Sequence, residues 1–79
     1  MKVGMMGIGH LGLPVALAIE SRGHEVHGYD VSSAPYNYLA SGHIPYQEEG
    51  LQPLLDNHNI QMHKSIGEVV ANSEIIFLA

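Results

Sequence analysis

Three glycines near the N-terminus have the spacing of a turn that binds phosphate groups. The motif is Gly7-x-Gly9-x-x-Gly12, and it directly follows an apolar run. In such a turn the first glycine lets the chain bend sharply, and the second leaves room for a pyrophosphate beside the backbone. The third lets the next helix pack closely on the strand. Unpaired N–H groups at the start of that helix would then face the phosphates. The pattern predicts a dinucleotide-binding turn.

A carboxylate follows the glycines at about the distance expected of a ribose-binding acid. Asp30 lies 18 residues after Gly12, at the end of a second apolar stretch. A carboxylate there can accept hydrogen bonds from the ribose hydroxyls and would repel the 2′-phosphate of NADP. No Arg or Lys occurs in the next few residues. The sequence therefore favours NAD over NADP. The alternative is a strand–turn–helix whose glycines serve packing alone, in which Asp30 would have no role.

Strand and helix patterns alternate along the chain that must position these residues. The expected strands cover residues 3–8, 25–29, 60–63 and 74–79, with the third near a sheet edge. The expected helices cover residues 10–22, a short segment capped by Ser32 or Ser33, residues 49–58, and a last helix opened by Ser65 with Ile66, Val69 and Val70 facing inward. In the first helix the apolar residues at helical spacing, which should pack on the sheet, are Leu13, Ala16, Leu17 and Ile19. Alternation of this kind is typical of α/β proteins with right-handed crossovers. It predicts a partial Rossmann-type, doubly wound parallel sheet of about four strands in the order 3-2-1-4.

Composition excludes several other kinds of site and partner. The 79-residue chain has no Cys, so it offers neither disulfides nor a zinc–thiolate site. A formal net charge of −5 argues against nucleic acid as a partner, and no apolar run is long enough to span a membrane. The six histidines lack the spacing of metal ligands, and no Ser has a nearby His–Asp arrangement. We expect no metal site, no catalytic residue and no membrane partner in this chain, and a cytoplasmic location.

Four segments together resemble the UDP-glucose/GDP-mannose 6-dehydrogenase family. Residues 7–16 are similar to its G-x-G-Y-V-G-L-P-x-A motif, and residues 23–30 to G-H-x-V-x-G-x-D. Residues 45–51, which include Glu48, look like P-x-x-E-P-G-L, and residues 74–79 resemble A-D-V-I-F-I-A. This family oxidises the C6 alcohol of a nucleotide sugar to a carboxylate with two NAD⁺. The resemblance covers essentially the whole chain but only the start of the family's proteins. It implies that residues 1–79 are the N-terminal portion of a dinucleotide-binding domain.

The resemblance also implies roles for individual residues. The pyrophosphate loop would comprise Gly7, Gly9, Leu11 and Gly12, with Leu11 acting through its backbone N–H. Asp30 would bind the adenosine ribose, and we include His10 and Val31 among the expected cofactor-binding residues. His10, Pro35 and Glu49 depart from the family's usual Tyr, basic residue and Pro. The family's catalytic residues and nucleotide-sugar domain come later in its sequences, so these 79 residues alone are not expected to catalyse the reaction.

Two other functions stay open at this point, together with one structural expectation. The chain could belong to the 6-phosphogluconate/β-hydroxyacid dehydrogenase group, which shares the glycine loop but usually lacks the Gly-Leu-Pro extension. It could also be a non-catalytic nucleotide-binding module. The last apolar strand is expected at a sheet edge with little cover, and such an edge is a template for pairing. We therefore expect self-association through this strand.

Overall fold

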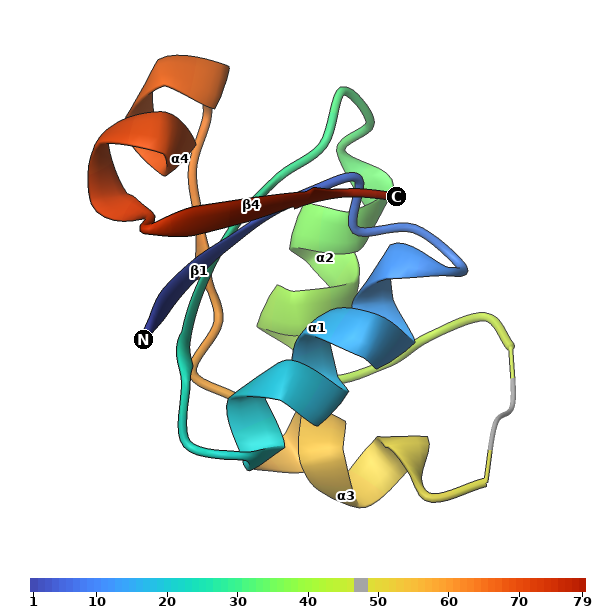
Figure 1. The fold of residues 1–79 in the computed structure, drawn as a ribbon. Coiled ribbons are helices and arrows are strands. Elements are labelled where there is room, and N and C mark those ends of the chain that lie inside the picture. The colour runs from blue at the N-terminus through green and yellow to red at the C-terminus, as the bar shows by residue number, and fades with distance from the viewer. Residues whose placement is uncertain (47–48) are drawn as a thin grey trace.

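The computed structural model describes residues 1–46 and 49–79 as one parallel four-stranded sheet with helices on both faces (Figure 1). Glu48, part of the third family-like segment, lies outside the described residues. In chain order the elements are β1 (Lys2–Met6), α1 (Gly12–Ser21), β2 (Glu25–Tyr29), α2 (Ala34–Ser41), α3 (Leu51–Asp56), β3 (Gln61–Met62), α4 (Ile66–Asn72) and β4 (Ile75–Leu78). The strand order is β3-β2-β1-β4, so the predicted fold class and order are confirmed.

The central strand β1 sets the register of the sheet. It pairs in parallel with β2 from Lys2↔Glu25 to Met6↔Tyr29, and with β4 from Val3↔Ile75 to Met6↔Leu78. The outer strand β3 adds only two paired positions to β2. Three successive residues, Val3, Gly4 and Met5, are buried, as expected for a strand covered on both faces. Because all four strands run in the same direction, their carboxyl ends lie at the same edge of the sheet.

The helices form two layers. Helix α1 packs on β1, β2 and α3, whereas α4 packs on β1 and β2. Figure 1 shows α4 on the other side of the sheet from α1, α2 and α3. The main core lies beneath α1, whose predicted apolar face is confirmed: Leu13, Ala16 and Leu17 are buried together with Leu55 of α3. Among the described residues, no helix is long and apolar enough to cross a membrane.

Helix α4 differs from the prediction. Of its three apolar positions expected to face inward, only Val69 is buried, whereas Ile66 and Val70 are 55% and 52% exposed. This short helix rests on the middle of the sheet, and no other described helix packs beside it, so its flanking positions face solvent. Ser65 does begin the helix as predicted, because its hydroxyl accepts a hydrogen bond from the Glu68 N–H.

The starts of two other helices differ from the predicted positions. Helix α1 begins at Gly12 rather than near residue 10, because the glycine turn precedes it. Helix α3 begins at Leu51, since Gly50 has a φ of +81°, which no right-handed helix can include. The hydroxyl of Ser32, not that of the N-cap residue Ser33, accepts the Ala34 N–H at the start of α2.

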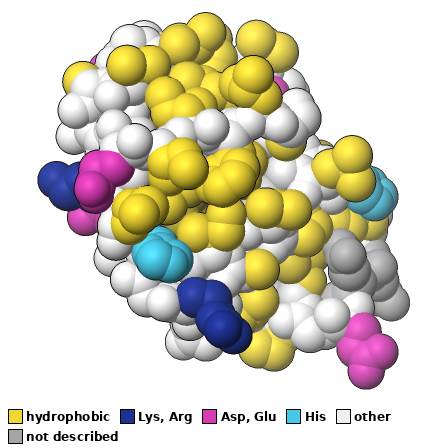
Figure 2. Space-filling view, in the orientation of Figure 1, with side chains coloured by type: hydrophobic (Ala, Val, Ile, Leu, Met, Phe, Trp, Pro, Cys, Tyr) yellow, Lys and Arg dark blue, Asp and Glu magenta, His cyan; other side chains and the backbone are white. Residues whose placement is uncertain are grey.

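The strand β4 lies at the free edge of the sheet and exposes apolar side chains. Ile75 and Phe77 are about two-fifths exposed, and Leu78 is 83% exposed. The space-filling view shows hydrophobic side chains gathered over the region where Figure 1 draws β4 (Figure 2). Both the free backbone edge and this apolar surface are features that promote association.

Candidate functional site

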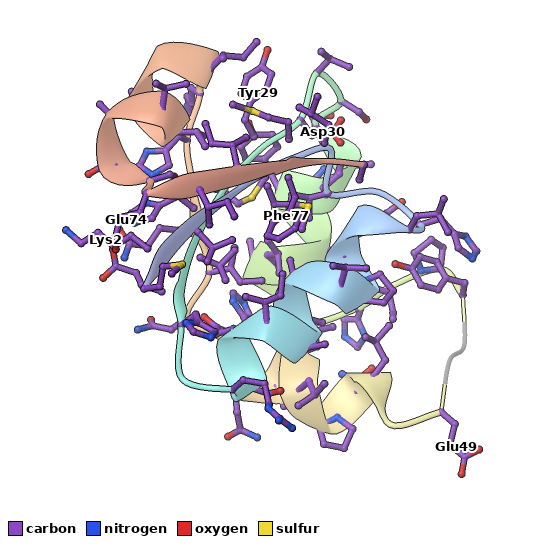
Figure 3. The ribbon with its side chains drawn as sticks, viewed as in Figure 1. Lys2, Tyr29, Asp30, Glu49, Glu74 and Phe77 are labelled. Atoms are coloured by element: carbon purple, nitrogen blue, oxygen red, sulfur yellow. The ribbon has the colours of Figure 1, made fainter. Side chains whose placement is uncertain are left out.

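The predicted site residues gather where the carboxyl ends of β1, β2 and β4 meet. The Gly7 N–H donates to Tyr29 O over 2.8 Å, and the Ala79 N–H donates to Met6 O over 3.0 Å. In Figure 3, Asp30 lies at this end of the sheet, and Lys2 and Glu74 lie at the other. Ligands of doubly wound sheets bind at the carboxyl ends of the strands. The geometry thus places the candidate residues where this fold binds ligands.

Three hollows meet around Asp30. One of about 530 Å³ is also lined by Gly7, Val31 and Leu78, and one of about 410 Å³ by Tyr36. The third, of about 280 Å³, is also lined by Gly9 of the glycine turn and by Tyr46. A larger hollow of about 600 Å³ lies at the opposite end of the sheet and is lined by none of the predicted residues. We assign the site to the carboxyl ends because the phosphate-binding turn lies there.

The three motif glycines meet different surroundings, as the motif predicts. Gly7 has a φ of +94°, which lets the chain turn out of β1. A Cβ added to Gly12 would lie 1.8 Å from the carbonyl oxygen of Gly7, so only glycine allows α1 to approach the turn this closely. A Cβ added to Gly9 would meet nothing within 4 Å. The fold therefore requires glycine at positions 7 and 12, whereas Gly9 borders a space that the described residues do not fill.

The start of α1 points its backbone toward this space. Leu11 is the N-cap residue, and no described side chain caps the helix there. The side chain of Leu11 is exposed, and the role expected of this residue is that of its backbone N–H. The first N–H groups of a helix lack intrahelical partners and carry a partial positive charge. This end of α1 can therefore receive an anionic group such as a phosphate.

The carboxylate of Asp30 is held by two backbone N–H groups. Its Oδ2 accepts from the Ile8 N–H over 2.9 Å, and its Oδ1 accepts from the Ser32 N–H over 2.8 Å. The first bond ties the end of β2 to the glycine turn. The packing-only alternative gave Asp30 no role, and the structure corrects this, because the residue braces the turn. Each carboxylate oxygen still has a lone pair for a further donor.

His10 and Val31 flank this carboxylate. The imidazole of His10 stacks on the ring of Tyr46 with centroids 4.3 Å apart and planes inclined by 21°. His10 lines the 280 Å³ hollow with Gly9 and Asp30. Val31 is 91% exposed and lines the 530 Å³ hollow. All seven candidate residues therefore lie around one edge of the sheet.

Sequence reasoning missed two residues at this edge. Lys64 lines the 410 Å³ hollow beside Asp30, although no basic residue occurs in the few positions that directly follow Asp30. Tyr36 places its hydroxyl against the main chain of Asp30 and of His63. A signal was available for Lys64: it directly follows the strand predicted at residues 60–63, and parallel strands end at a common edge.

A buried histidine lies outside the candidate site. His27 Nε2 is 2.5 Å from Glu25 Oε2, and His27 Nδ1 is 2.7 Å from His63 Nε2. The hydrogen bond from His27 lowers the pKa of the Glu25 carboxyl, and the nearby positive charges of Lys2 and the N-terminus act in the same direction. No group of three potential metal ligands occurs among residues 1–46 and 49–79. The contact between His27 and His63 links β2 to the segment after β3.

Comparisons with known proteins agree with this arrangement. The family model described as "UDP-glucose/GDP-mannose dehydrogenase family, NAD binding domain" matches residues 1–79. A GDP-mannose 6-dehydrogenase of Pseudomonas aeruginosa is 40% identical over 55 residues, which are 70% of this chain and 13% of that protein. A UDP-N-acetyl-D-mannosamine dehydrogenase of Methanococcus maripaludis is 31% identical over 74 residues, which are 89% of this chain and 17% of that protein.

A solved structure is similar over the whole chain. The crystal structure of a GDP-mannose dehydrogenase from Pseudomonas aeruginosa superposes with a TM-score of 0.86 at 30% identity, covering 100% of this chain and 19% of that one. The 79 residues thus span less than one fifth of each of these three proteins.

Proposed function

Because the chain belongs to the UDP-glucose/GDP-mannose dehydrogenase family and matches its NAD-binding domain, we propose that the cofactor binds at the carboxyl ends of β1 and β2. In this proposal the pyrophosphate lies against the glycine turn and the start of α1, and Asp30 binds the adenosine ribose. His10 and Val31 flank the adenosine half of the cofactor. The four residues of the pyrophosphate loop are Gly7, Gly9, Leu11 and Gly12.

The open space at Gly9 carries this proposal. The neighbouring Gly12 is packed so tightly that a Cβ would collide with the backbone, whereas a Cβ on Gly9 would meet only open space. Packing alone therefore accounts for a glycine at position 12 and not at position 9. A phosphate group that approaches the backbone gives the second position its reason. The surroundings of Gly9 and the uncapped start of α1 fit the diphosphate of NAD.

For the whole protein, we propose a nucleotide-sugar 6-dehydrogenase to which this chain supplies the NAD-binding part. Oxidation of a primary alcohol to a carboxylate removes two hydrides in succession, and each NAD⁺ accepts one. Residues beyond this portion would supply the catalytic groups and the nucleotide-sugar site. The relatives described above are all nucleotide-sugar dehydrogenases, which favours this function over the hydroxyacid dehydrogenase alternative. The cytoplasmic location stays a prediction.

We further propose that the 79-residue chain self-associates through β4. This strand lies at the end of the sheet, and its apolar residues Ile75, Phe77 and Leu78 are exposed. A second copy could extend the sheet along the free edge and cover these side chains. At the other edge of the sheet, β3 has only two residues, Gln61 and Met62, and the exposed one is the polar Gln61.

The proposed cofactor site is tested by calorimetric titration of the chain with NAD⁺ and with NADP⁺. We expect NAD⁺ to bind more tightly, because the Asp30 carboxylate repels a 2′-phosphate. Gly9→Ala should weaken NAD⁺ binding about tenfold or more, since its methyl group occupies the space of the phosphate. The matched control is Gly67→Ala, because a Cβ there also meets nothing within 4 Å but lies on α4. Equal NAD⁺ affinities of wild type and Gly9→Ala would refute the assignment.

A further inference from the structure

A tyrosine hydroxyl takes the place of one hydrogen bond between β2 and β3. The ladder of these strands continues past β3, because the His63 N–H donates to Gly28 O over 2.8 Å. In a regular parallel ladder the Asp30 N–H would next donate to His63 O. Instead, the hydroxyl of Tyr36 from α2 lies between these two groups. Tyr36 therefore bridges the strand ends where a direct bond is expected.

The groups around the Tyr36 hydroxyl decide to which of them it donates its hydrogen and from which it accepts one. A tyrosine hydroxyl has one hydrogen to donate and lone pairs to accept. The Tyr36 hydroxyl contacts His63 O most closely, and its hydrogen is assigned to that carbonyl. Its oxygen then accepts the Asp30 N–H over 3.4 Å, with Asp30 O 3.3 Å away. The bridge thus holds the main chain of Asp30 on the side opposite the glycine turn.

Asp30 is consequently fixed from both sides. Its carboxylate is bound by the N–H groups of Ile8 and Ser32, and its main chain by Tyr36. The other end of the bridge is anchored as well, because the His63 ring is hydrogen-bonded to the buried His27. Removing the hydroxyl would let the strand ends close into a direct bond or leave two main-chain groups to water. Either change removes the support that the Tyr36 hydroxyl gives to the main chain of Asp30.

We propose that Tyr36 is a positioning residue for recognition of the adenosine ribose, acting through Asp30. The inference rests on the proposed function, because it assumes that Asp30 binds the ribose hydroxyls. It predicts that loss of the Tyr36 hydroxyl weakens the contact with the ribose and spares the contacts with the phosphates. The two effects separate when ligands with and without the 2′-hydroxyl are compared on the same variant.

The experiment measures affinities for ADP and 2′-deoxy-ADP. The ratio of the two cancels any change in the folded fraction of a variant. Wild type should prefer ADP by about tenfold or more, the effect of one hydrogen bond to a charged group. Tyr36→Phe should reduce this preference to less than about threefold. Asp30→Asn serves as the reference, and the double variant should lose no more than Asp30→Asn alone.

The control removes a hydroxyl from the other end of the same helix. Ser41 Oγ accepts the His43 N–H at the end of α2, away from the strand ends, so Ser41→Ala should keep the wild-type preference. If wild type prefers ADP and Tyr36→Phe does so equally, the inference is overturned while the proposed site stands. If wild type binds neither ligand nor NAD⁺, the proposed site fails as well.

Discussion

Replacing Gly12 by alanine should destabilise the protein strongly, although alanine is the better helix former. The new Cβ would lie 1.8 Å from Gly7 O, 2.8 Å from Gly7 C and 3.3 Å from the Cβ of Ala79. All three atoms belong to the backbone or to a side chain too short to move aside. The start of α1 must therefore retreat from the turn by more than about 1 Å, because contacts below 3.0 Å are not tolerated. Such a shift also pulls Leu13 out of the core, where it is fully buried.

The cost is large relative to the total stability. Overpacking of a well-packed site costs about 1–3 kcal/mol and occasionally more, and this contact is severe enough to expect about 3 kcal/mol. A chain of this size has a free energy of unfolding of about 4–12 kcal/mol. At about 4–8 °C per kcal/mol, the midpoint of thermal unfolding should fall by about 12–24 °C.

The assay is thermal unfolding followed by far-UV circular dichroism, with Gly67→Ala as the matched control. Both glycines lie in helices, and both substitutions add one methyl group. A Cβ on Gly67 meets no atom within 4 Å, so the control should gain up to about 0.5 kcal/mol, less than a glycine in the middle of a helix because Gly67 lies in the first turn of α4. The two variants should therefore change stability in opposite directions. A Gly12→Ala midpoint within about 2 °C of wild type would refute the reasoning.

Three further predictions concern charge and association. The stabilising contribution of Glu25, whose pKa is lowered mainly by the hydrogen bond from His27, is complete above its ordinary pKa of 4.5 and is lost as the pH falls through the lower folded value. In denaturant titrations Glu25→Gln should therefore be less stable than wild type near neutral pH and equal to it in strong acid, and a constant difference at all pH values would contradict this assignment. Lys64→Ala should leave NAD⁺ affinity unchanged and weaken any residual NADP⁺ binding, because Lys64 supplies the cation in the hollow beside Asp30; calorimetry showing equal losses for both cofactors would rule this out. In a sedimentation dilution series the wild-type chain should associate and Leu78→Lys should be monomeric, since a charge on an edge strand opposes pairing; a wild-type monomer at every concentration would count against pairing through β4.

The local sequence was sufficient for the glycine turn and for the elements on either side of it. Glycine spacing predicted a turn between a buried strand and a helix, and the apolar spacing of Leu13, Ala16 and Leu17 predicted the buried face of that helix. The position of Asp30 at the edge of the sheet followed from the length of β2. These features depend on neighbours close in the chain, so the sequence pattern contains them. The strand order joins segments far apart in the chain, and its prediction came from the doubly wound fold class that the alternating elements indicate.

Other features depended on where distant segments meet. Ile66 and Val70 have the same spacing pattern as buried residues, and only the absence of a neighbouring described helix leaves them exposed. The brace that Asp30 forms with Ile8 spans 22 residues, and the Tyr36 contact with His63 spans 27. No local pattern marks either pair.

The sequence by itself therefore determined the kind of fold, the glycine turn that we propose faces the cofactor, and the identity of the acid beside it. The tertiary structure alone decided how that acid is held, which cation lies near it and which apolar surface stays open. The physical reason is the range of the interactions involved. Backbone conformation and helix or strand periodicity are set within a few residues. Hydrogen bonds between Asp30, Tyr36 and the end of β3 exist only once the crossovers have brought three separate elements to one edge of the sheet.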